Sequence, residues 1–320
     1  MAKLQSTEIV GVANRPTTIC SNTICFWFDT TKSKSVASYC GYLGAWSAGG
    51  AMITSRCYLA GAGTQNEGLA MGGYTNVTVS CTEEYNGTSW SAGGVLITSR
   101  YGLSGTGTQN IGLTFGGYPT TSNVGSTCTE EYNGTSWSSG GALINGRGLL
   151  TGSGTQNEGL AIGGALSNTS VSCTEEYNGT SWSAGGSMLR ARTLLAGAGT
   201  QNAGLTFGGV HSNFNSSSMV EEYNGTSWSV GSKLNFNLRG LSGSGTQNAG
   251  LAFGGCALTS ALAYTEEYDG NTWSRGGSLI NPNFFAAGTG LQNAALSMGG
   301  NIGTCTEEYN TTLTIIDKYI

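Results

Sequence analysis

Acidic side chains are concentrated in one short motif that recurs along the chain. Twelve of the eighteen Asp and Glu residues lie in six Glu-Glu-Tyr triplets, the first of which is Glu83, Glu84 and Tyr85. Paired carboxylates can act as general acid and base, and clustered carboxylates can bind Ca²⁺. Six equal copies of one acid pair do not make one active site. We therefore expect a structural role, with a Ca²⁺ site as the alternative.

The first Glu of each triplet needs a partner, and an arginine before the first strand of the repeat is the natural candidate. In a strand, Cys81, Glu83 and Tyr85 share one face, where a carboxylate is half buried. A guanidinium can bind such a carboxylate through two hydrogen bonds. The repeat arginines are Arg56, Arg100, Arg147, Arg192 and Arg239, whereas Asn283 departs. We predict Glu–Arg pairs formed from Glu83, Arg100, Glu130, Arg147, Glu175 and Arg192.

Few other residues could support catalysis. His211 is the only histidine, which argues against a copper oxidase site with paired histidines. Asp occurs only at positions 29, 269 and 317, which argues against a glycosidase. The glycine-rich stretches contain no G-x-x-x-x-G-K-[ST] phosphate loop. We expect no catalytic residue, no metal and no cofactor, so the chain is predicted not to be an enzyme.

The triplets belong to a repeat of about 45 residues. Its tryptophans, spaced by 44, 47, 45, 46 and 45, are Trp46, Trp90, Trp137, Trp182, Trp228 and Trp273. GTQN (GLQN in the last copy), a Gly-Gly pair and Glu-Glu-Tyr recur between them. We expect each Trp to pack between neighbouring units, with sugar stacking as the alternative. Asn-Gly-Thr, as at Asn86, matches a glycosylation acceptor, but a hairpin turn is the favoured interpretation.

Each unit is predicted to form a four-stranded antiparallel sheet, because apolar residues alternate and no helical period occurs. The first strand is rich in small residues, as in LAGAG and LSGTG. Such residues fit innermost strands crowded around a shared axis. The sequence therefore predicts an all-β fold, a β-propeller of four-stranded antiparallel blades, with a β-solenoid as the alternative.

The number of blades depends on the two ends of the chain. We expect an N-terminal arm over 1–14 and a propeller over 15–320, with six regular repeats at 48–309 and a closing strand at 310–320. Residues 15–47 are either a degenerate first blade or a closure segment. Seven blades are favoured, because Asn22 lies as far before Trp46 as Asn66 lies before Trp90. Six blades are the alternative, with the segment around Trp46 completing the last one.

The pattern of Gly-Gly, Tyr and Trp with a preceding Arg resembles the kelch repeat, over about four fifths of the chain. TEEYNGTSWSAGG followed by GTQNxGLxFGG is similar to repeats in virion-associated proteins of marine tailed phages. FWFDTTKSKSVASYCGYLGAW also resembles a short module of phage tail fibres. The kelch resemblance implies a binding propeller of six or seven blades. The phage resemblance implies a structural or host-contacting part of a virion.

The loop between Gly-Gly and Glu-Glu varies most, with 9, 12, 10, 11, 10 and 6 residues in the six copies. Length differences in repeat proteins gather on one face, which often binds a ligand, although drift in exposed loops is the alternative. Ser, Thr and Asn with scattered aromatics suit adaptable polar contacts. The candidate ligand-binding residues are Tyr74, Tyr118, His211, Asn213 and Phe214.

Composition excludes several classes of protein. A net charge of -5 gives no basic surface for nucleic acid. No apolar run is long enough for a membrane span or a secretion signal. Of the nine cysteines, Cys81, Cys128, Cys173 and Cys305 recur at one repeat position, which favours packing in a reducing compartment over disulfides.

We therefore expect a non-enzymatic phage virion protein, located in the virion after assembly in the host cytoplasm. Its loops would contact a host-surface glycan or receptor, and its terminal segments would dock to other virion proteins in an oligomeric particle. A cellular kelch-type scaffold for protein–protein interaction is the alternative.

Overall fold

The computed structural model describes residues 9–12, 24–29, 34–119, 124–211, 215–257, 259–301 and 303–319. Within these ranges, side chains are described at positions 35, 36 and 44–312. The chain divides into two compact units. One, which we call the wheel, is Ala45–Asn310, and the other combines Met1–Gly44 with Thr311–Ile320. In the described part of the chain, no helix is long and apolar enough to cross a membrane.

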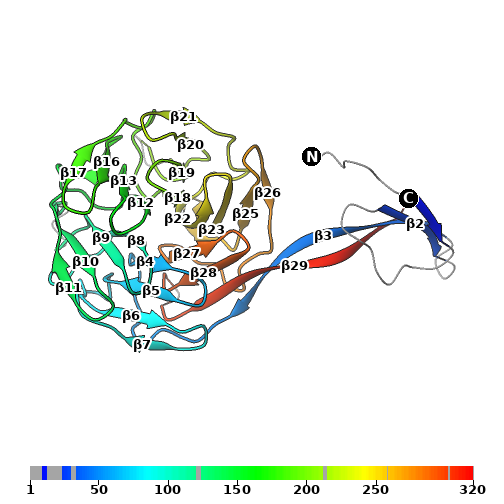
Figure 1. The fold of residues 1–320 in the computed structure, drawn as a ribbon, viewed down its shortest axis with the longest axis horizontal. Helices are drawn as coiled ribbons and strands as arrows, with labels where there is room; N and C mark the ends of the chain where they lie inside the picture. Colours follow the sequence, from blue (N-terminus) through cyan, green and yellow to red (C-terminus); the bar gives the residue numbers. More distant parts are fainter. Residues whose placement is uncertain are drawn as a thin grey trace. The chain divides into compact units, whose positions relative to one another are not determined.

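Six sheets make up the wheel, and Figure 1 shows them arranged around one centre. Blade 1 contains β4 (Ala60–Gly63), β5 (Gly68–Met71), β6 (Thr82–Tyr85) and β7 (Trp90–Ala92). Blade 2 contains β8 (Ser104–Gly107), β9 (Gly112–Phe115), β10 (Thr129–Tyr132) and β11 (Trp137–Ser139). Blade 3 contains β12 (Thr151–Gly154), β13 (Gly159–Ile162), β16 (Thr174–Tyr177) and β17 (Trp182–Ala184), with a small hairpin of β14 (Ala165–Leu166) and β15 (Thr169–Ser170).

The other three blades follow the same order from the centre outward. Blade 4 contains β18 (Ala196–Gly199), β19 (Gly204–Phe207), β20 (Val220–Tyr223) and β21 (Trp228–Val230). Blade 5 contains β22 (Arg239–Thr246), β23 (Ala249–Ala257), β25 (Thr265–Tyr268) and β26 (Trp273–Arg275), and β24 (Ser260–Ala261) pairs with β23. Blade 6 contains β27 (Ala287–Leu291), β28 (Ala294–Met298), β29 (Thr306–Tyr319) and β3 (Lys34–Ala48). The prediction of a propeller with four-stranded antiparallel blades is confirmed.

The preference for seven blades is wrong, because the wheel has six. Residues 34–48 form β3, a strand beside β29 that completes blade 6, as in the alternative in which the segment around Trp46 completes the last blade. Trp46 on β3 donates its indole N–H to Thr265 of blade 5, as Trp90 donates to Thr306 of blade 6. Residues 310–319 continue β29, and β3 takes the place of the fourth strand.

Inner strands from neighbouring blades touch around the whole ring, including β27 with β4. A Cβ added to Gly105 would lie 3.3 Å from the carbonyl oxygen of Gly61 and 2.5 Å from the Met71 side chain. Any larger residue at Gly105 would therefore push two blades apart. This close approach explains why small residues recur on the innermost strands.

Apolar clusters lie between blades. The cluster of blade 1 residues that includes Leu69 and Met71 also contains Tyr132 and Trp137 of blade 2. Each blade thus packs against the blade before it and the blade after it. A blade taken alone would expose an apolar face. Stability therefore arises from nearest-neighbour packing, as in other repeat proteins.

The recurring Gln of GTQN links the blades through the backbone. The Gln109 side-chain amide donates to the carbonyl oxygens of Gly68 (3.0 Å) and Tyr85 (2.6 Å) in the preceding blade. The other blades repeat the arrangement with Gln65, Gln156, Gln201, Gln247 and Gln292.

The second unit includes β1 (Ile9–Val12), which pairs in parallel with β2 (Ile24–Asp29), and β2 pairs antiparallel with β3. The expected arm at 1–14 thus contains a strand at 9–12. The rest of that arm lies outside the described residues.

Candidate functional site

In blades 1 to 4 the first carboxylate of each Glu-Glu pair is buried against an arginine. Arg100 lies 2.9 Å from Glu130, and Arg192 lies 2.9 Å from Glu221. Arg56 lies 3.0 Å from Glu83, and Arg147 pairs with Glu175. Each pair joins a strand to the connection that enters its own blade. The Glu130 carboxylate also accepts the backbone N–H of Ile97 (2.7 Å) in that connection.

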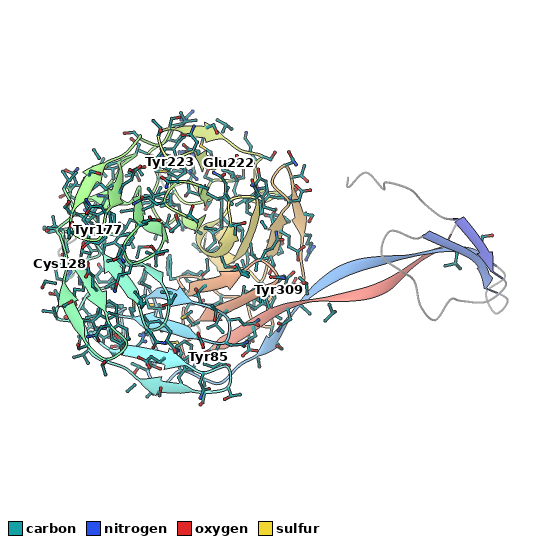
Figure 2. The ribbon with its side chains drawn as sticks, viewed as in Figure 1. Tyr85, Cys128, Tyr177, Glu222, Tyr223 and Tyr309 are labelled. Carbon is teal, nitrogen blue, oxygen red and sulfur yellow. The ribbon has the colours of Figure 1, made fainter. Side chains whose placement is uncertain are left out.

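The second carboxylates link one blade to the next. Tyr132 donates its hydroxyl to Glu84 at 2.6 Å, and Tyr223 donates to Glu176 at the same distance. Figure 2 shows Tyr85, Tyr177, Tyr223 and Tyr309 at corresponding places around the wheel. Burial, followed by the hydrogen bond to Glu131, raises the pKa of Tyr177 to about 12. Both carboxylates of the pair therefore have structural partners.

Arg239 does not occupy the repeat arginine position. Leu238 does, because its N–H and C=O make the bonds that Arg192 makes in blade 4 (Leu238 N–H to Ser217 O, Gly209 N–H to Leu238 O). Blade 5 therefore lacks the guanidinium. Oε1 of the buried Glu266 has no hydrogen-bond partner among the described residues. The sequence analysis placed the repeat arginine one residue too late. The segment 234–240 (LNFNLRG) contains no recurring motif that would fix its alignment with the other repeats.

A closed ring of backbone hydrogen bonds surrounds one end of the central channel. The N–H of one residue per blade donates to the C=O of its counterpart in the preceding blade, over 2.7–3.0 Å. We call these six residues the mouth: Tyr58, Gly102, Leu149, Leu194, Gly240 and Phe285. Because each blade both donates and accepts, the ring itself holds the mouth to one diameter.

All six mouth residues have left-handed backbone conformation. The φ angles are 54° at Tyr58, Leu149 and Leu194, and 58° at Phe285. This conformation costs a non-glycine residue roughly 1–2 kcal/mol. Gly102 and Gly240 adopt it without that cost, so the bulky residues at the other four positions are not required by the backbone. Strained residues of this kind gather at binding sites.

Residue identity varies around the mouth, whereas the contacts below it recur from blade to blade. These contacts are the Arg–Glu pairs, the Tyr–Glu links, the Trp–Thr hydrogen bonds and the Gln links to the preceding blade, and we call them the frame. Two further positions in each blade flank the mouth, and we call them rim positions. The first precedes each mouth residue: Cys57, Tyr101, Gly148, Thr193, Arg239 and Phe284. The second follows each Gly-Gly pair: Tyr74, Tyr118, Ala165, Val210, Cys256 and Asn301. The two are paired across the sheet, as in Cys57 with Tyr74. No residue type repeats at the first rim position, and at the second only Tyr occurs twice.

Aromatic rings lie side by side on one half of this face. Tyr58 stacks on Phe285 with ring centres 4.0 Å apart, and Tyr101 lies 5.9 Å from Tyr58. Tyr74 lies 5.4 Å from Tyr101. We call these four residues the aromatic row. All four are half-buried, so part of each ring faces solvent.

The structure places the predicted ligand-binding residues differently. Tyr74 belongs to the aromatic row, whereas Tyr118 is 2% exposed and donates its hydroxyl to Ala165 O at 3.3 Å. The Tyr118 ring lies over Gly148, so it supports the row from beneath through Tyr101 (5.4 Å). His211 is half-buried next to the rim residue Val210. Asn213 and Phe214 lie outside the described residues.

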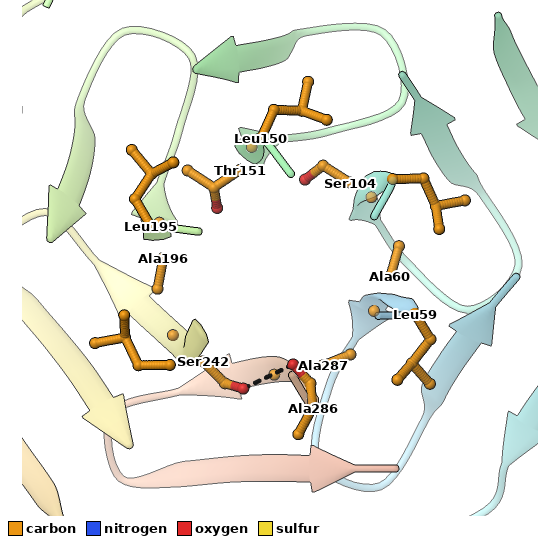
Figure 3. A pocket seen from close by; sticks show the side chains of 18 residues that line it. Leu59, Ala60, Ser104, Leu150, Thr151, Leu195, Ala196, Ser242, Ala286 and Ala287 are labelled. Carbon is orange, nitrogen blue, oxygen red and sulfur yellow. Dashed lines mark hydrogen bonds between the residues drawn. The ribbon is translucent and has the colours of Figure 1, made fainter. Parts of the chain in front are cut away.

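The channel below the mouth is polar but carries no charge. Figure 3 shows Ala60, Ser104, Thr151 and Ala196 around an open centre. The Ser242 hydroxyl donates to Ala286 O at 2.9 Å, which the dashed line marks. This part of the channel holds a cavity of about 120 Å³ lined by residues of all six blades. No described residue group of three or more His, Cys, Asp or Glu could hold a metal ion.

Comparison with known proteins supports the fold. A solved structure, described as "Structure of YjhT", aligns with a TM-score of 0.69 at 11% sequence identity. The alignment covers 84% of this chain and 100% of that chain. In all, 435 solved chains match. Searches with family models and with curated protein sequences return no match. At this identity the likeness shows a shared β-propeller fold and nothing about activity.

The sequence interpretation missed two sets of residues. The Gln of GTQN was given no contact, although its presence in every copy signalled one. The mouth was missed because its hydrogen bonds connect residues about 45 positions apart. A signal did exist, since the residue before each inner strand is Tyr, Gly, Leu, Leu, Gly and Phe within an otherwise constant stretch.

Proposed function

We propose that the chain is a non-enzymatic, kelch-like binding module of a phage virion, with the mouth face as the contact to the host surface. One observation carries the proposal: residue identity changes from blade to blade around the mouth, whereas the frame is repeated. A purely structural wheel has no reason to vary there in most blades while its frame departs mainly in blades 5 and 6. Drift would also reach the exposed turns on the opposite face, yet Asn-Gly recurs in four of the six units.

The polar residues of the wheel also support a binding role without catalysis. The Glu-Glu carboxylates are engaged in links within and between blades, and the channel is lined by small uncharged residues. No described mouth or rim residue is a carboxylate that could serve as general acid or base. The residues near the centre therefore suit recognition of a ligand.

The virion assignment rests on the resemblance of the repeats and of residues 26–46 to phage proteins. In this proposal the second unit docks to another virion protein, and the chain is oligomeric in the particle. Immunogold electron microscopy of purified particles from the source phage tests it. Labelling of the particle is expected, and labelling confined to infected-cell lysate would contradict a virion role.

Host contact is tested with the isolated full chain. Fluorescently labelled protein is expected to bind host cells, and exchange of the loop 74–80 for its blade 3 counterpart 165–172 should reduce binding. The matched control changes the opposite face, with Thr88→Ala in the turn of the same blade. If both changes reduce binding equally, or if neither does, the mouth face is not the contact.

A further inference from the structure

We infer that the mouth face binds a neutral carbohydrate chain, held off the central axis by the aromatic row. This inference rests on the proposed binding function and adds the chemical class of the ligand. It depends on three observations: the geometry of the row, the absence of charge from the variable loops, and the difference between the two halves of the mouth.

The aromatic row presents ring faces and hydroxyl groups together. Tyr58, Tyr74 and Tyr101 each combine an apolar ring with one donor and acceptor group. Such residues give a large, rigid contact at low entropic cost. A sugar ring offers a C–H face for stacking and hydroxyls at its edge, so it matches both parts of a half-exposed tyrosine. Phe285 stacks on Tyr58 with ring centres 4.0 Å apart and so holds the Tyr58 ring in place.

The variable loops contain no Asp, Glu, Lys or Arg. They are rich in Ser, Thr and Asn, with a few aromatic residues and one histidine, His211. Among the mouth and rim positions, all of which are described, Arg239 is the one charged residue. Nucleic acid depends on several phosphate contacts from Lys or Arg, and this face does not offer them. With hydrogen-bonding groups in every loop and a single cation, this face favours a neutral ligand that forms hydrogen bonds.

The two halves of the mouth differ in a way that sets the ligand's position. Phe285, Tyr58 and Tyr101 belong to the entries of blades 6, 1 and 2. Blades 3 and 4 present Gly148, Leu149, Thr193 and Leu194 at the same places. A ligand on the axis would contact both halves equally, whereas stacking draws it over blades 6, 1 and 2. The uncharged channel beneath adds no competing ionic site.

The chain supplies its own matched substitutions for a test. Tyr58→Leu copies Leu149 and Leu194 at an equivalent mouth position, and Tyr101→Thr copies Thr193 at an equivalent rim position. Both replacements are residues that the frame already accommodates, so folding should persist. Leu194→Gly, which copies Gly102 and Gly240, is the control on the opposite half. Thermal melting of each variant checks that the wheel is intact.

The test is an array of neutral, sialylated and sulfated oligosaccharides, followed by calorimetric titration with the neutral sugars that bind. Tyr58→Leu with Tyr101→Thr is expected to weaken binding by about tenfold or more, because these residues are central anchors. Leu194→Gly is expected to change it by about twofold at most. Binding only to sialylated or sulfated members, or equal losses in both variants, would overturn the inference.

Two further results distinguish a wrong carbohydrate assignment from a wrong host-contact function. If labelled protein binds host cells but no array member, and if protease but not periodate treatment of the cells abolishes binding, the ligand is a protein. The inference is then wrong while the host-contact function stands. If wild-type protein binds neither cells nor sugars, the proposed function itself fails.

Discussion

Blades 2 and 5 have the same four strands but not the same contacts. In blade 2, Arg100 pairs with Glu130, and Trp137 donates its indole N–H to Thr82 of blade 1 at 3.0 Å. In blade 5, Leu238 replaces the arginine, and Trp273 faces Val220 where other blades have Thr. Glu266 Oε1, Trp273 Nε1 and Ser244 Oγ all lack a hydrogen-bond partner among the described residues. The fold therefore tolerates the loss of individual frame contacts in one blade.

The difference separates two kinds of variation. Blade 5 loses frame contacts at buried positions, where a loss lowers stability but no ligand can reach. The mouth and rim positions vary around one end of the channel, where Tyr58, Tyr74, Tyr101 and Phe285 are half-buried, although the rim residues Tyr118, Ala165, Val210 and Cys256 are themselves buried. Only the second kind of variation bears on recognition, so stability and binding should respond to different substitutions.

The largest expected effect is a loss of stability when blade 2 receives the leucine that blade 5 has at the repeat arginine position. Arg100→Leu leaves Glu130 buried without its cation, and breaking a buried pair in this way costs about 3–5 kcal/mol. Urea denaturation of the full chain measures the loss in free energy of unfolding. A loss below about 1 kcal/mol would mean that the pair contributes little, as exposed pairs do.

Alkaline pH should act on all blades alike. Burial raises the pKa of Tyr85, Tyr177 and Tyr223 from 10.0 to about 12. Above pH 10 the unfolded tyrosines lose protons that the folded ones retain, so the folded state binds more protons and stability falls as pH rises. The free energy of unfolding should therefore be constant below pH 10 and decrease between pH 10 and 12. A profile that stays flat through this window would contradict the buried Tyr–Glu links.

Repair of blade 5 is expected to have a moderate effect in the opposite direction. Leu238→Arg gives the orphaned Glu266 oxygen a donor, which should recover about 1–3 kcal/mol of desolvation cost. The control is Leu234→Arg, because Leu234 is buried in the apolar cluster between blades 4 and 5, where an added guanidinium is expected to destabilise. If Leu238→Arg destabilises as much as the control, the arginine position has been repacked and blade 5 is no longer a defective copy.

The smallest effect concerns the indole of Trp273. Val220→Thr restores the acceptor that Trp137 finds in Thr82, and one such hydrogen bond contributes about 0.5–1.5 kcal/mol. The reciprocal change, Thr82→Val, should lower stability by a similar amount. Equal and opposite shifts in urea midpoint would confirm that the two sites are equivalent, whereas shifts of the same sign would refute it.

Residues that repeat without change could be interpreted from sequence. Trp, Glu-Glu-Tyr and the small inner-strand residues indicated strands, interfaces and a shared axis, and the structure has all three. The blade count could not be obtained in this way, because Trp46 fits either an extra blade or the last strand of blade 6. Pairing of β3 with β29, about 270 positions away along the chain, decides it. The register of Leu238 and the mouth ring likewise depend on contacts between distant residues.

Frame residues are predicted to determine stability, and mouth and rim residues to determine binding. One experiment measures both properties. Tyr74→Val with Tyr101→Thr gives blades 1 and 2 the rim residues of blade 4 (Val210 and Thr193), and Thr82→Val alters only the frame. Host-cell binding and urea stability are measured for both variants. The rim variant is expected to lose binding at unchanged stability, and the frame variant is expected to lose stability at unchanged binding. A rim variant that unfolds more easily yet binds normally would contradict these expectations.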